Sequence, residues 1–138
     1  MPLWIGYALL AAFFAALVAI FGKVGIKEVD ATLATAVRAV VMAVFLVTAA
    51  VVLGKTGGLG GISRRSFAFI VLSGAAGAAS WLFYFIALRE GPVTGVAALD
   101  RLSVVFVFVL AVVFLGDAFT VKAALGAALV VAGAILLT

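Results

Sequence analysis

The chain has 138 residues, of which 69% are hydrophobic and only 10% charged, with a mean hydropathy of +1.50. Soluble domains are usually about 45–50% apolar and about 25% charged, so this composition excludes a water-soluble fold. It predicts an all-α integral membrane protein, because a helix satisfies its own backbone hydrogen bonds in lipid. The length is that of one domain, residues 1–138.

Cysteine and histidine are both absent. Their absence excludes thiolate or imidazole metal sites, disulfides and Ser/His or Cys/His nucleophile pairs, so we expect no enzyme, metal or cofactor. The net charge of +4 is typical of loops beside anionic lipid, and no basic stripe with exposed aromatics indicates nucleic-acid binding. The expected partner is therefore the lipid bilayer, in the cell (plasma or inner) membrane.

Five apolar runs approach the roughly 20 residues that a membrane-spanning helix needs. In chain order they are 3–21, 32–53, 66–88, 93–115 and 121–137. We expect Asp30 to cap the second helix, Pro92 to begin the fourth, and Thr120 to cap the fifth. The glycine-rich connection 54–65 lacks the order of a phosphate-binding loop and is interpreted as a mobile linker. Four or six spans are weaker alternatives to five.

The odd number of spans places the two termini on opposite sides of the membrane. Lysine and arginine residues near the spans divide three against four between the two sides: Lys23, Lys27 and Arg89 against Lys55, Arg64, Arg65 and Lys122. This bias normally sets orientation, and here it is nearly absent. The chain either inserts in both orientations or adopts one through details beyond the count.

A single five-helix unit is small for enclosing a solute pathway. Many transporters pair two repeats of inverted topology around a site at the membrane midplane. A chain with balanced charges could supply both copies itself, as an antiparallel homodimer, which is the arrangement that we predict.

Three ionisable residues lie deep within the predicted spans. Arg38 is about 9–10 Å along run 32–53, while Asp100 and Arg101 are about 10–12 Å along run 93–115. Both runs start from the same membrane face, so the three residues are expected at similar depth. They either tie helices together as an ion pair or line a solute pathway. We favour the pathway, because buried ions are costly, and their net positive charge favours an anionic or zwitterionic solute.

Two further pairs are candidate functional residues. Trp81 and Tyr84 are three residues apart, so they share a helix face near the charged depth and could line the same cavity. An interfacial aromatic belt or plain packing is the alternative.

Gly126 and Gly133 are seven apart and lie on nearly one face of the last run. Small residues permit close helix approach, so they predict a dimer contact, with packing inside the protomer as the alternative.

Four stretches of the chain carry a resemblance to a known family: 15–27, ending Phe-Gly-Lys-Val-Gly-Ile-Lys; 34–38 with its arginine; 81–92, Trp-Leu-Phe-Tyr-Phe-Ile-Ala-Leu-Arg-Glu-Gly-Pro; and the hairpin and glycine-rich helix 114–133. Through these stretches the chain resembles one EamA repeat of the drug/metabolite transporter superfamily. Asp117 stands where the family usually has glutamate, and 100–103 replaces a region where two-repeat relatives often carry proline. The first helix lacks the carboxylate used by the small multidrug relatives, which leaves Asp100 as the only deep candidate for proton coupling.

This resemblance implies five transmembrane helices and transport of small organic solutes or metabolites, often by paired inverted repeats. We therefore expect a secondary transporter that works as a dual-topology homodimer by alternating access. The alternatives are a channel-like pore and a non-transporting assembly partner of a larger carrier. A pore through one protomer is disfavoured, because residues 104–115 are almost wholly apolar.

Overall fold

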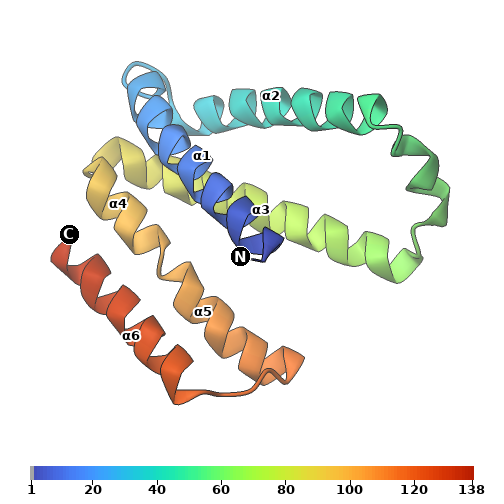
Figure 1. Ribbon diagram of the computed structural model, residues 1–138. Coiled ribbons are helices and arrows are strands. Elements are labelled where there is room, and N and C mark those ends of the chain that lie inside the picture. The colour runs from blue at the N-terminus through green and yellow to red at the C-terminus, as the bar shows by residue number, and fades with distance from the viewer. Residues whose placement is uncertain (1) are drawn as a thin grey trace. The chain divides into compact units, whose positions relative to one another are not determined.

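The computed structural model describes residues 2–138, which form helices and connections without any strand (Figure 1). The segments are α1 Leu3–Gly25, α2 Ala31–Val52, the 3₁₀ segment η1 Thr56–Gly61, α3 Arg64–Glu90, α4 Val93–Asp100, α5 Ser103–Leu110, the π-helical segment η2 Ala111–Leu115, and α6 Val121–Leu136. Four helical stretches are long and apolar enough to cross a membrane, and α6 is a shorter apolar helix. The all-α membrane fold with about five spans is confirmed.

Two of the predicted helix caps are confirmed. The Oδ1 atom of Asp30 accepts from the backbone amides of Thr32 and Leu33, at 2.8 and 3.1 Å. These amide bonds, more than the nearby Arg89 guanidinium, hold the pKa of the Asp30 carboxyl below its usual value. Thr120 likewise caps α6 through its hydroxyl oxygen.

Pro92 differs by one position from its expected place. It is the N-cap of α4, and Val93 is the first helical residue. Its φ of −70° leads into the helix, and its ψ of 141° is still extended. The proline ring therefore fixes φ at the N-cap, the residue directly before the first turn of the helix.

The fourth apolar run is not one continuous α-helix. At the junction of α4 and α5, four amides donate to carbonyls three residues back: Arg101 to Ala98, Leu102 to Leu99, Val104 to Arg101, and Val105 to Leu102. This spacing is the tighter 3₁₀ pattern, which interrupts the regular i to i−4 ladder. The interruption therefore falls where the sequence places two charges inside an apolar span.

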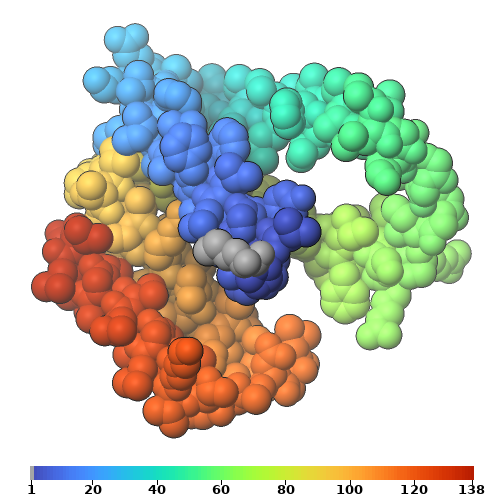
Figure 2. All heavy atoms as spheres, in the orientation of Figure 1, coloured from blue at the N-terminus to red at the C-terminus, as the bar shows by residue number. Residues whose placement is uncertain are grey.

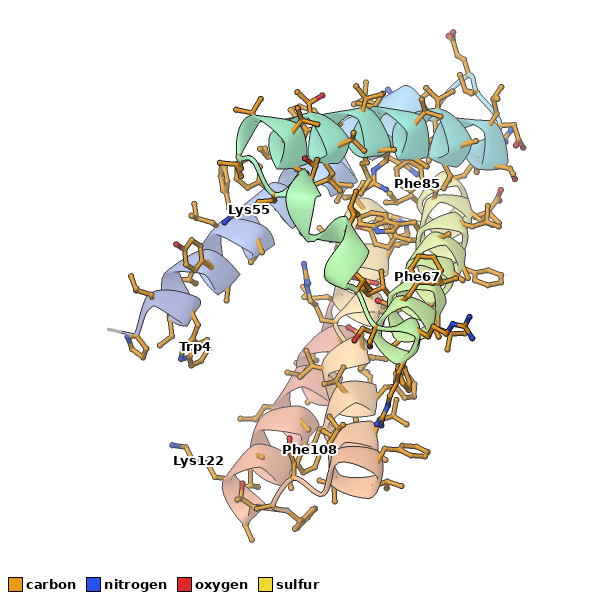
Figure 3. The ribbon with its side chains drawn as sticks, turned by 90° about the vertical axis from the view of Figure 1, so that its right-hand side faces the viewer. Trp4, Lys55, Phe67, Phe85, Phe108 and Lys122 are labelled. Carbon is orange, nitrogen blue, oxygen red and sulfur yellow. The ribbon has the colours of Figure 1, made fainter. Side chains whose placement is uncertain are left out.

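The described residues divide into two compact units. The terminal unit contains the residues up to 23 together with 90–138, and the central unit contains residues 24–89. In the terminal unit α6 packs along α4 and α5 (Figure 1). A Cβ atom on Gly95 would lie 3.3 Å from Pro92 Cγ and 3.5 Å from the carbonyl oxygen of Leu137, so the missing side chain permits this close approach. The ring centres of Phe108 on α5 (Figure 3) and of Phe119 in the connection before α6 lie 5.7 Å apart.

In the central unit α2 and α3 approach one another at one end and diverge towards η1. At the close end the Arg89 Nη1 atom lies 3.5 Å from Asp30 Oδ2. Towards η1 a gap remains between the helices when all atoms are drawn (Figure 2). One face of α2 bears an apolar hollow of about 280 Å³, lined by Val41, Met42, Phe45 and Leu46. Lipid or another chain must cover such a face in a bilayer.

Candidate functional site

Arg38 is held against aromatic rings of α3. Its guanidinium carbon lies 3.6 Å from the centre of the Trp81 ring and 5.5 Å from that of Phe85. Arg38 is in the second turn of α2, within a run that carries no other charged residue. A cation over an aromatic face is attracted by the ring quadrupole, most strongly where water is excluded. The contact therefore keeps one positive charge at a defined place in an apolar span.

Three aromatic side chains of α3 form a cluster beside Arg38. Trp81 meets Tyr84 edge-on at 5.4 Å between ring centres, and Phe85 lies 6.1 Å from Trp81 and 6.2 Å from Tyr84. Their spacing of three and four residues places them on one helix face. The predicted shared face of Trp81 and Tyr84 is thus confirmed, and we call Arg38, Trp81, Tyr84 and Phe85 the arginine–aromatic cluster.

Phe85 was not among the residues predicted from the sequence. It is only 3% exposed and lies between α2 and α3 (Figure 3). Its position four residues after Trp81 is the sequence signal that could have identified it. The run Trp81 to Leu88 contains several apolar residues of this kind, so periodicity alone could not single out Phe85.

Asp100 and Arg101 belong to the terminal unit, whereas Arg38 belongs to the central unit. Asp100 is the last residue of α4, Arg101 is its C-cap, and both side chains are exposed. Within the terminal unit neither side chain forms a hydrogen bond or an ion pair among the described residues. The assembly of all three charges into one polar cluster therefore stays a prediction.

Lys23 makes a contact that the sequence did not indicate. Its Nζ atom donates to the carbonyl oxygen of Gly91 at 2.9 Å, and the bond is partly buried. Gly91 directly follows α3, where helix carbonyls lack partners within the helix and favour a nearby cation. The bond ties the end of α1 to the turn before α4.

The glycines of α6 face open space. No heavy atom lies within 4 Å of a Cβ built on Gly126 or on Gly133. Ala134, next to Gly133, is only 4% exposed, so the two glycines flank the face by which α6 packs in the protomer. A neighbouring helix could therefore approach them closely.

Within residues 2–138 no group of three or more Asp or Glu side chains is placed to hold a metal ion. The described residues thus provide a cation on an aromatic face, an interrupted apolar span and helices with exposed apolar faces. These features define a multi-pass membrane protein with polar groups placed inside its spans.

Comparison with known proteins identifies the family within this class to which the chain belongs. The chain belongs to the EamA-like transporter family, whose sequence profile matches residues 2–138. It is 42% identical over 134 residues to a Sinorhizobium sp. protein described as "Uncharacterized transporter in cobO 3'region", covering 97% of this chain and 95% of that protein. No solved structure matches the chain. The family and this relative support a membrane transporter rather than an enzyme.

Proposed function

We propose that the protein is a secondary transporter of small organic solutes or metabolites in the cell membrane, working as an antiparallel homodimer by alternating access. The observation that carries this proposal is Arg38 stacked on Trp81 inside an apolar span. A charge in the hydrocarbon region costs a few kcal/mol or more, and such residues usually serve a solute or ion pathway. Trp81 and Tyr84 are the proposed neighbours of the solute.

The interrupted fourth span supports the same function. Carriers often place their binding sites at discontinuous helices, where backbone groups and nearby charges can contact the solute. Here the interruption carries Asp100 and Arg101. We propose that Arg101 contributes to solute binding and that Asp100 serves proton coupling, since it is the only carboxylate deep within a span.

Three features support the antiparallel dimer. Positive charges flank the spans in nearly equal number on the two sides, which favours insertion in both orientations. The gap between α2 and α3 leaves apolar faces that a second copy would cover (Figure 2). The open faces of Gly126 and Gly133 would permit close helix contact.

Reconstitution into liposomes tests the carrier function. Flux of radiolabelled organic anions, zwitterions and cations should include a solute that saturates and is accelerated by unlabelled solute on the opposite side. Arg38→Gln should abolish that exchange, while Arg65→Gln, at the exposed start of α3, should leave it unchanged. Ionic conductance would instead show a channel, and absence of both would show an assembly partner.

A further inference from the structure

The guanidinium of Arg38 presents its edge, rather than its face, to a ligand. At 3.6 Å from the Trp81 ring centre, the group must lie nearly parallel to the ring, because tilting it would drive a nitrogen into the ring. Stacking therefore covers one face of the guanidinium. The five N–H donors all lie in its plane and point outward from the stack.

These donors are not used within the central unit. Arg38 is partly exposed, and none of its guanidinium N–H groups donates to an acceptor among residues 24–89. Unmet donors in the hydrocarbon region are costly, so a ligand that accepts two of them would be favoured there. The plane of the guanidinium is already fixed by Trp81 and Phe85, which lowers the entropy lost on binding.

Charge balance selects the kind of anion. Arg38 is the only charged residue in 31–54, and 66–88 contains none, so one positive charge stands in this part of the span. A monoanion would neutralise it, whereas a dianion would leave a net negative charge in a low-dielectric region. A carboxylate also matches two parallel N–H donors in one plane, which gives a bidentate pair.

We propose that Arg38 is the receptor for the carboxylate of a small organic monoanion, bound in the guanidinium plane with Trp81 behind it. This inference deepens the proposed transport function and rests on it for the role of the site. A cationic solute would compete with Arg38 for the same aromatic faces. An inorganic phosphate dianion would exceed the single positive charge that residues 31–54 and 66–88 contain.

Trp81 itself reports occupancy of this site. The chain has two tryptophans, so Trp4→Phe leaves Trp81 as the only tryptophan, whose emission can be excited selectively. In nanodiscs of phosphatidylcholine, sodium butanoate should change Trp81 emission saturably, with a midpoint in the millimolar range. Butylammonium chloride and inorganic phosphate, at equal ionic strength, should act at least about tenfold more weakly.

Variants in the same single-tryptophan background separate charge from shape. Arg38→Lys keeps the charge but loses the planar fork, so butanoate binding should weaken by about tenfold. Arg38→Gln should abolish it, and Arg65→Gln should bind as the parent does. If Arg38→Gln fails to fold by circular dichroism, Arg38→Lys decides the question. Undiminished butanoate binding in Arg38→Lys would then overturn the inference.

Two other results would overturn it. Stronger binding of butylammonium than of butanoate would show that the aromatic faces receive a cation. Loss of the butanoate response in nanodiscs containing phosphatidylglycerol, with Trp81 emission already shifted, would show that a lipid headgroup occupies Arg38. Binding is measured without flux, so butanoate binding without any exchange would overturn only the carrier function. Exchange without butanoate binding would overturn only the carboxylate receptor.

Discussion

The guanidinium carbon of Arg38 on α2 lies 3.6 Å from the ring centre of Trp81 on α3, although the two residues are 43 positions apart in the chain. In the central unit α2 and α3 diverge towards η1, and this stack joins them nearer the end at which Asp30 and Arg89 are paired. The contact that would orient Arg38 for the proposed ligand therefore also joins the two helices.

The stack should contribute measurably to stability. In a double-mutant cycle of Arg38→Gln and Trp81→Leu, we expect a coupling of about 0.5–2 kcal/mol in the free energy of unfolding, as for other cation–π pairs. Unfolding in mixed detergent micelles, followed by circular dichroism, measures it. A cycle of Arg65→Gln with Trp81→Leu is the control and should show no coupling. Equal coupling in both cycles would contradict the stack as its source.

Asp100 should carry the coupled proton. Asp100→Asn cannot ionise, so proton-driven uptake into liposomes should be lost while binding of solute persists. Asp117→Asn, in the connection before α6, is the matched control and should retain proton-driven uptake. Uptake with unchanged dependence on pH in Asp100→Asn would end the proposed role of this carboxylate.

Both orientations in the membrane should be detectable by thiol labelling. The chain has no cysteine, so Glu28→Cys between α1 and α2 and Gly58→Cys in η1 give single, exposed labels in consecutive connections. In a dual-topology protein a membrane-impermeant maleimide should label about half of each population in intact cells. Complete labelling of one variant and none of the other would show a single orientation.

The glycines of α6 should determine dimerisation. A Cβ atom at either position meets no atom within 4 Å in the protomer, so in Gly126→Leu and Gly133→Leu the protomer should fold while the dimer weakens. Crosslinking in liposomes should fall several-fold. Ala128→Leu, two positions from Gly126 and so on the opposite helix face, should crosslink as the parent does. Unchanged crosslinking in both glycine variants would place the dimer contact elsewhere.

The cap formed by Asp30 should make stability depend on acid. Because amide donors lower its folded-state pKa below 3.8, its ionised form stabilises the fold above that value, and this contribution is lost as pH falls through the lowered pKa. Between pH 5 and pH 2 the melting temperature of Asp30→Asn should fall less than that of the parent, because the variant lacks the carboxylate. Scanning calorimetry in detergent measures both decreases. Glu28→Gln, which caps no helix, should retain the full decrease. Equal decreases in Asp30→Asn and the parent would contradict this role.

The sequence by itself determined that the chain is helical and lies in lipid. In hydrocarbon a long apolar run satisfies its backbone hydrogen bonds as a helix, and its apolar side chains prefer lipid to water. The sequence also located the caps at Asp30 and Thr120, whose hydrogen bonds reach only three residues along the chain. Trp81 and Tyr84 were paired correctly for the same reason: residues three apart on one helix must be neighbours. These are local relationships.

Only the tertiary structure decided that Arg38 stacks on Trp81 and that Phe85 completes the cluster, since those contacts depend on how α2 crosses α3. It also showed the interruption between α4 and α5, where apolarity predicted one continuous helix. Hydropathy records how much each residue prefers lipid. It holds no information on the angle at which two helices cross, or on which amide donates to a given carbonyl. The direction in which a side chain meets another helix is fixed by packing, and here packing holds the charge of Arg38 against the Trp81 ring.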